Sequence, residues 1–79
     1  MKVRVEVMLK EGVLDPQGKA ISHALGTLGF HGVSDVRVGK SMIIETTETN
    51  EAKAIESAKE MAKKLLTNLV IEDFTVTVL

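Results

Sequence analysis

The sequence contains no cysteine, tryptophan or tyrosine, and only one proline and two phenylalanines among its 79 residues. Because there is no cysteine, the chain can form neither a disulfide nor a thiolate metal site. Its two histidines, His23 and His31, cannot complete a tetrahedral metal site without carboxylate ligands. A chain of this length buries only about 60% of the surface that its unfolded form exposes, so such domains often rely on disulfides, metals or oligomerisation. Oligomerisation is the support that remains, and we expect a homo-oligomer, either a dimer or a tetramer.

An excess of charge of one sign is also missing, since ten basic and eleven acidic residues leave a net charge of −1. Proteins that bind nucleic acids usually carry a basic excess and aromatic side chains on which bases stack. Phe30 and Phe74 are the only large aromatic side chains, so we expect no nucleic-acid partner. No apolar run approaches the roughly 20 residues that cross a bilayer, so we expect no membrane partner. The first residues, MKVRVEV, alternate and lack the apolar segment of a signal peptide, which predicts a cytoplasmic protein.

The first half of the chain shows a strand pattern followed by a helix pattern. Residues 2–10 alternate between apolar and polar, as in a strand with one buried face. Asp15 and Pro16 predict a helix start, because Asp15 can accept a hydrogen bond from a first-turn N–H and proline has no N–H to leave unpaired. A helix of about 13 residues follows. Gly29 suits the left-handed position after its end, with Phe30 folding back. The apolar face of this helix is formed by Ala20, Ile21, Ala24, Leu25 and Leu28.

The second half predicts two strands, a helix and a last strand. Residues 33–39 alternate as a strand, and a short turn at Gly39 and Lys40 would join them to a third strand at 41–46 in a hairpin. The polar residues 47–50 offer a cap for the second helix, Asn68 could take a left-handed position at its end, and residues 70–79 return to strand. The expected apolar stripe of the second helix consists of Ile55, Ala58, Ala62, Leu65 and Leu69.

These elements predict a single α+β domain over residues 1–79 with the order β-α-β-β-α-β. Right-handed crossovers would place the four strands in one antiparallel sheet with both helices on one face.

No set of residues suggests catalysis. The serines lack a nucleophile motif such as G-x-S-x-G, and the many glutamates alternate with lysines as on a solvated helix face. Gly26, Gly29 and Gly32 follow a helix instead of preceding one, so they do not form a phosphate-binding loop.

Two features of the sequence are not explained by a solvated surface or by loop positions. Gly18 lies inside the first helix, where glycine costs roughly 0.5–1 kcal/mol relative to alanine. Either another part of the chain approaches closely there, or the first turn is frayed. The second feature is the sheet face opposite the helices, which mixes charged and apolar side chains and would be uncovered. In a small chain this face is a candidate for self-association, through Arg4, Glu6, Met8, Thr75 and Thr77.

Three segments of the chain resemble the PurS family. Residues 9–18 read LKEGVLDPQG and are similar to the family stretch LK-x-x-V-L-D-P-Q-G. Residues 36–40, VRVGK, and residues 71–73, IED, are similar to its later segments at matching spacing. The resemblance covers essentially the whole chain.

What the resemblance implies is a non-catalytic subunit of formylglycinamidine ribonucleotide (FGAM) synthase in purine biosynthesis. In that family a PurQ glutaminase subunit releases ammonia, a PurL synthetase subunit uses ATP and Mg²⁺, and PurS bridges the two. The chain itself would bind no cofactor. The resemblance is most specific around the first helix start and VRVGK, so the candidate partner interface is Gln17, Gly18, Arg37 and Lys40. We expect Arg37→Ala and Gln17→Ala to leave the melting temperature nearly unchanged.

A regulatory small-molecule-binding module of the ACT type is the alternative. It shares the β-α-β-β-α-β order and binds its ligand near the first strand–helix turn, which corresponds here to residues 11–17. Fold alone does not decide between the two functions.

Overall fold

The computed structural model describes all residues, 1–79, as three strands and two helices. The order of the elements is β1 (Lys2–Leu9), α1 (Pro16–Thr27), β2 (Gly39–Glu45), α2 (Glu51–Met61) with a π-helical turn η1 (Ala62–Leu66), and β3 (Glu72–Val78). The strands form one antiparallel sheet in the order β2-β1-β3. None of the helices has the length and apolar character needed to cross a membrane.

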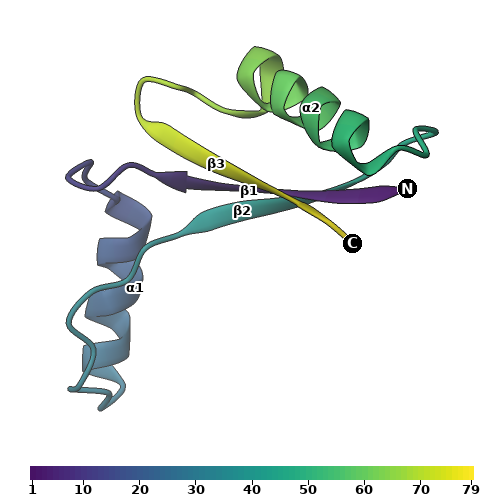
Figure 1. Cartoon of the computed structure of the whole chain (residues 1–79). Helices are drawn as coiled ribbons and strands as arrows, with labels where there is room; N and C mark the ends of the chain where they lie inside the picture. Colours follow the sequence, from purple (N-terminus) through teal and green to yellow (C-terminus); the bar gives the residue numbers. More distant parts are fainter.

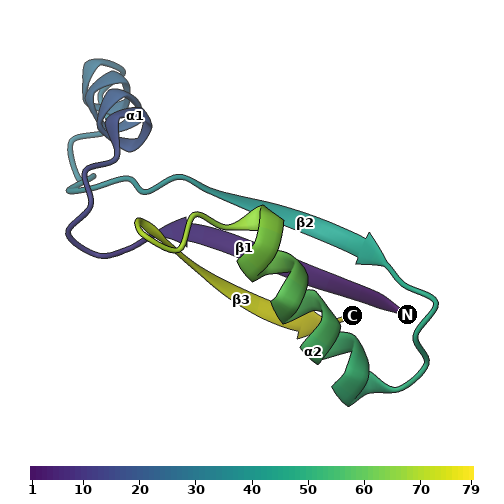
Figure 2. The ribbon, with the colours of Figure 1, turned by 90° about the horizontal axis from the view of Figure 1, so that it is seen from above.

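The core lies between the sheet and α2. The central strand β1 buries Val3, Val5 and Val7, each at most 1% exposed, on the face toward α2. The helix covers these valines with alanines spaced four residues apart, whose small side chains allow the backbone of α2 to approach the sheet closely. Figure 2 shows α2 lying across β1 and β3. The buried alanines are Ala54, Ala58 and Ala62.

In contrast, α1 stands beyond the end of the sheet and covers neither of its faces (Figures 1 and 2). The chain is therefore long and thin, at 48 × 25 × 14 Å, with a radius of gyration of 15.9 Å. A compact chain of this length would have a radius of about 12 Å. The apolar face of α1 is uncovered, and Ile21 and Leu28 are 38% and 72% exposed.

The predicted four-stranded sheet with both helices on one face is therefore wrong in two respects. Residues 33–38 form no strand, and Gly39 and Lys40 begin β2 instead of making a turn. The physical reason is that the backbone N–H of Val38 donates to the carboxylate of Asp15, 2.8 Å away, and not to a strand. This contact holds the segment against the start of α1.

The predicted ends of α1 are confirmed. Asp15 has extended backbone angles and its side chain accepts a hydrogen bond from the N–H of Gly18, with Pro16 at the first helical position. At the other end Gly29 has a φ of +98°. The N–H of Phe30 donates to the carbonyl of Leu25 at 2.9 Å, which is the six-residue bond of a Schellman ending.

The end of α2 differs from the prediction, although the Asn50 cap at its start is confirmed. The N–H of Thr67 donates to the carbonyl of Ala62, five residues earlier, and this wider turn rotates the following side chains by about one position. Leu66, four residues after the buried Ala62, packs on the core, whereas the expected core residue Leu65 is turned outward and is 84% exposed. Asn68 does not adopt the predicted left-handed conformation; the residues with a positive φ in this protein are all glycines.

Candidate functional site

Asp15 joins the start of α1 to the segment before β2. Its Oδ1 accepts the N–H of Gly18 at 2.9 Å and its Oδ2 accepts the N–H of Val38 at 2.8 Å. The side chain is only 4% exposed. The hydrogen bond from Val38 is the largest cause that lowers the pKa of Asp15 below its ordinary value; the bond from Gly18 and the charge of Arg37 add to it, and burial opposes it. Asp15 is thus a charged structural bridge, which is more than the cap predicted from the sequence.

Arg37 also has a structural role. Its Nη1 donates to the carbonyl of Val13 at 2.7 Å and its Nη2 donates to the carbonyl of Lys10 at 3.0 Å. The planar fork of the guanidinium group thereby fixes the loop between β1 and α1. Part of its donor capacity is thus used inside the chain, and the expectation that Arg37→Ala leaves stability unchanged no longer follows.

Gly18 is explained by a close approach of two backbone segments. A Cβ at this position would overlap the carbonyl oxygen of Val36 and lie 2.9 Å from its carbonyl carbon. Gly18 is buried and its N–H is bonded to Asp15, so the first turn of α1 is not frayed. Of the two explanations that the sequence left open, close approach is confirmed.

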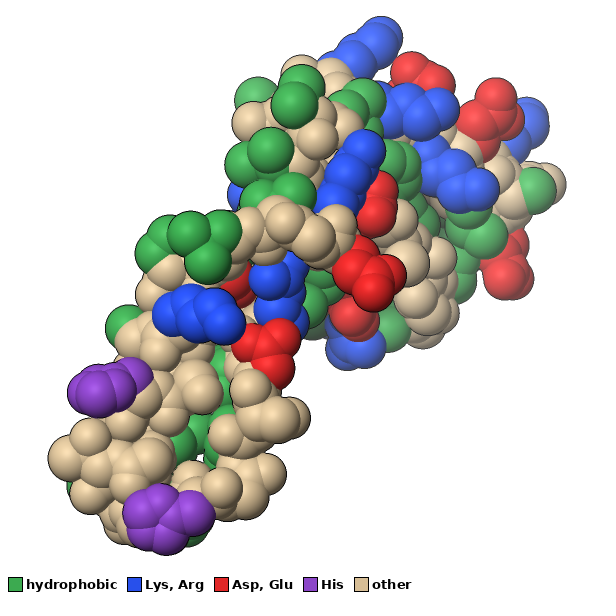
Figure 3. All heavy atoms as spheres, turned by 90° about the vertical axis from the view of Figure 1, so that its left-hand side faces the viewer, with side chains coloured by type: hydrophobic (Ala, Val, Ile, Leu, Met, Phe, Trp, Pro, Cys, Tyr) green, Lys and Arg blue, Asp and Glu red, His purple; other side chains and the backbone are tan.

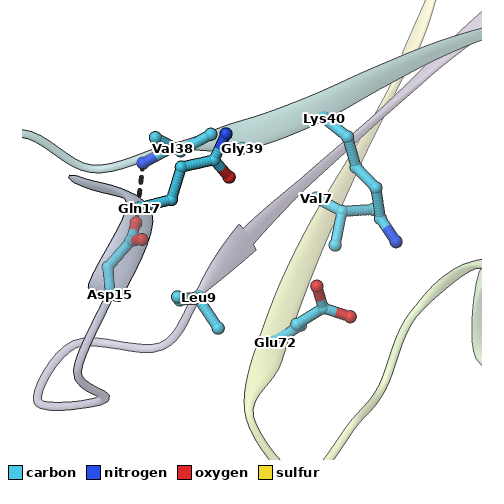
Figure 4. A pocket seen from close by; sticks show the side chains of 8 residues that line it. All are labelled: Val7, Leu9, Asp15, Gln17, Val38, Gly39, Lys40 and Glu72. Atoms are coloured by element: carbon cyan, nitrogen blue, oxygen red, sulfur yellow. Dashed lines mark hydrogen bonds between the residues drawn. The ribbon is translucent and has the colours of Figure 1, made fainter. Parts of the chain in front are cut away.

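Gln17 and Lys40 are the two members of the predicted interface whose side chains form no hydrogen bond or ion pair within the chain. Both line a hollow of about 250 Å³ between the start of α1 and the sheet (Figure 4). Glu72 lies across this hollow from Lys40. The remaining lining residues are Val7, Leu9, Asp15, Val38 and Gly39.

The chemistry of this site is that of recognition. An amide and an ammonium group beside the positive end of a helix can bind carboxylate or carbonyl oxygens of another molecule. Nowhere in the chain do three or more acidic, histidine or cysteine side chains lie together in a way that could hold a metal ion. Sequence reasoning missed Glu72 as a neighbour of Lys40, because only the pairing of β1 with both β2 and β3 brings the two together.

The predicted self-association face is one continuous surface. Arg4 lies opposite Thr77 and Glu6 opposite Thr75 in the register of β1 and β3. These residues point away from α2, because they alternate with the buried valines of β1. Ile43, which pairs with Arg4 on β2, is 58% exposed and extends the face. The grouping of these residues agrees with the sequence analysis, and self-association stays a prediction.

Comparisons with known proteins point to one family. The family model described as PurS, phosphoribosylformylglycinamidine (FGAM) synthase, matches residues 2–79. The PurS subunit of phosphoribosylformylglycinamidine synthase from Bacillus subtilis is 51% identical over 73 residues, which cover 92% of this chain and 86% of that protein.

Solved structures agree. The crystal structure of Methanocaldococcus jannaschii PurS is 45% identical, with a TM-score of 0.88 over 96% of this chain and 92% of that one. A chain in the structure of PurLQS from Thermotoga maritima is 33% identical, with a TM-score of 0.89 over 99% of this chain and 95% of that one.

Proposed function

The chain belongs to the PurS family, as the VLDPQG and VRVGK segments predicted, and from this premise we propose that it bridges a synthetase and a glutaminase subunit. It is an accessory subunit of phosphoribosylformylglycinamidine synthase, a ligase of purine biosynthesis. The family match favours this function over a regulatory small-molecule-binding module.

The bridge serves the transfer of ammonia. A PurQ-type glutaminase releases ammonia from glutamine, and a PurL-type synthetase uses ATP to activate the amide oxygen of formylglycinamide ribonucleotide, which ammonia then displaces as phosphate. Ammonia that escapes into water is diluted and protonated, so holding the two subunits together keeps it available. ATP and Mg²⁺ belong to the synthetase in this proposal, and the chain described here binds no cofactor. We place the assembly in the cytoplasm.

The observation that carries the proposal is the end-to-end likeness to a chain of the PurLQS structure. The site supports it, because the side chains of Gln17 and Lys40 form no bond within the chain and line a hollow open to another molecule. An elongated body of 48 Å can also contact two partners at separate places.

Self-association through the open sheet face is part of the same proposal. In a contact with two-fold symmetry, a residue meets its counterpart reciprocally. Arg4 and Glu6 lie two residues apart on this face, so a two-fold axis between them would pair each Arg4 with the Glu6 of the other copy. Neighbouring Met8 and Ile43 would supply the apolar area, since they are 43% and 58% exposed.

Reconstitution tests the bridging function. The synthetase and glutaminase subunits are assayed for FGAM formation with and without this chain, once with glutamine and once with ammonium chloride. We expect omission of the chain to lower the glutamine-dependent rate by about tenfold or more, because coupling of the two sites is lost. The ammonia-dependent rate should fall much less. Equal rates with glutamine in both mixtures would show that the chain is not the bridge.

A further inference from the structure

The two most exposed large apolar side chains of the protein lie near the end of α2. Leu65 is 84% exposed and Val70 is 82% exposed, and Leu69 between them is 48% exposed. We call these three residues the apolar patch. Figure 3 faces this end of the molecule and shows hydrophobic and basic side chains side by side on it. Exposed apolar side chains that gather at one place mark interaction sites more often than isolated ones do.

The π-helical turn places Leu65 in the patch. Leu66 lies four residues after the buried Ala62 and continues its face, whereas the wider turn between Ala62 and Thr67 turns Leu65 further from the direction of the buried alanines. Turns of this kind occur at helix C-termini and are frequent at functional sites. The chain therefore satisfies its core with one leucine and presents the next one to solvent.

The loop that carries Leu69 and Val70 is fixed by hydrogen bonds. The carboxylate of Glu72 accepts the N–H of Asn68 at 2.7 Å, and the side chain of Asn68 accepts the N–H of Val70 at 3.1 Å. The carbonyl of Asn68 also accepts the N–H groups of Ile71 and Glu72. A partner that binds this loop has little backbone entropy to remove, which favours affinity.

The charges around the patch decide which kind of partner fits. Lys59, Lys63 and Lys64 lie on the last turns of the helix. The acidic residues near them are Glu60, 4.0 Å from Lys63, and Glu72, whose carboxylate is bonded to the N–H of Asn68. If two copies of the chain bound each other patch to patch about a two-fold axis, the same lysines would face each other, and like charges brought together oppose binding. A different chain with carboxylates around an apolar surface would meet these lysines favourably.

The patch also adjoins the candidate interface. The N–H of Lys10, at the end of β1, donates to the carbonyl of Ile71 at 2.8 Å, so the loop is tied to the segment that leads to α1. Glu72, which fixes Asn68, also lines the hollow with Gln17 and Lys40 (Figure 4). One partner could cover both places.

We propose that the apolar patch is a docking surface for another subunit of the complex, whose contact surface is apolar and edged with carboxylates. This inference rests on the proposed function, since it locates one of the contacts that a bridging subunit requires. It places the main apolar contact at the end of α2, beside the predicted interface residues Gln17 and Lys40 and not among them.

Binding of the full-length chain to the separate synthetase and glutaminase subunits tests this inference. Dissociation constants are measured by calorimetry for the wild type and for Leu65→Ser and Val70→Ser. Because both side chains are more than four-fifths exposed, the melting temperature should hardly change. We expect each variant to raise the dissociation constant for one of the two subunits by about tenfold or more. Lys63→Glu should weaken the same contact, and more strongly at low salt than at high salt.

Leu28→Ser is the matched control, because Leu28, directly after α1 at the other end of the molecule, is 72% exposed. It should leave both dissociation constants unchanged. Unchanged binding of Leu65→Ser and Val70→Ser would overturn the inference while leaving the proposed function intact. A changed sedimentation coefficient of these variants alone would overturn it too, since it would assign the patch to a second copy. If the wild type binds neither subunit, the proposed function itself fails.

Discussion

Replacing Gly18 with alanine should destabilise the protein, although alanine is normally the better residue in a helix. The added methyl group would overlap the carbonyl oxygen of Val36. The carbonyl group of Val36 cannot move freely, because both residues that follow it are held. The side chain of Arg37 donates to the carbonyl of Val13, and the N–H of Val38 donates to Asp15. Extra groups in such a tight contact typically cost about 1–3 kcal/mol. The helix preference for alanine offsets about 0.5–1 kcal/mol of this, so a net loss of about 1–2 kcal/mol is expected.

Gly26→Ala provides the control within the same helix. A Cβ at Gly26 would meet nothing within 4 Å. The substitution should therefore stabilise the protein by about 0.5–1 kcal/mol. Since 1 kcal/mol shifts the melting temperature of a domain of this size by roughly 4–8 °C, the two variants should melt about 10 °C apart.

Thermal unfolding of both variants at one protein concentration measures this difference, and the fixed concentration keeps any contribution of self-association constant. Amide hydrogen exchange of Val38 gives a second measurement. Its N–H is protected by Asp15 in the wild type and should exchange faster in Gly18→Ala, because the displaced segment loses that bond. If Gly18→Ala melts as high as Gly26→Ala, the close approach to Val36 does not constrain the protein and our reasoning is refuted.

Four further predictions concern single side chains. Arg37→Ala should lower the melting temperature, because the loss of two half-buried charged hydrogen bonds costs about 1–2 kcal/mol of the free energy of unfolding. Arg37→Lys should be intermediate. An unchanged melting temperature of Arg37→Ala would show that the loop keeps its structure without these bonds. Because the folded pKa of Asp15 is lowered, its carboxylate stabilises the protein above the unfolded pKa and ceases to do so as the pH falls through the folded value. The gap in melting temperature between wild type and Asp15→Asn should therefore narrow from pH 7 to pH 3, and a constant gap would contradict this. Met8→Lys should weaken self-association in sedimentation equilibrium, whereas a monomeric wild type would rule out the sheet-face contact. Gln17→Ala should leave the melting temperature unchanged and lower glutamine-dependent FGAM formation more than ammonia-dependent formation; full activity with glutamine would place Gln17 on the plain surface.

The features that the sequence predicted correctly are local ones. Asp15 caps a bond from a residue three positions later, and Gly29 and Phe30 close the same helix within five residues. Such contacts depend on residues that are close in the sequence, so residue type and spacing suffice to predict them. The strand β1 was predicted just as readily, because strict alternation of apolar and polar residues requires only that one face of the strand is buried.

The features that could not be predicted depend on contacts between distant residues. Residues 35–38 alternate as in a strand, but their conformation is set by Asp15, which lies 23 positions before Val38. Arg37 bonds to the carbonyl of Lys10 across 27 positions, and no local pattern shows that its guanidinium group is already used. The partner interface therefore stays a prediction. The side chains of Gln17 and Lys40 form no bond within the chain, whereas Gly18 and Arg37 make contacts that serve the fold.

One contact cannot cover all the apolar surface that the chain leaves exposed. The open sheet face with Ile43 points away from α2, the apolar face of α1 lies on an arm beyond the sheet, and Leu65 and Val70 lie where α2 ends. A two-fold contact through the sheet face would cover Ile43 and leave the end of α2 free, because these surfaces lie on opposite sides of the sheet. A chain that buries few large side chains of its own thus leaves separate surfaces on which the proposed contacts with a second copy and with other subunits can form side by side. That division is what a bridging subunit requires, since each contact can form without displacing the other.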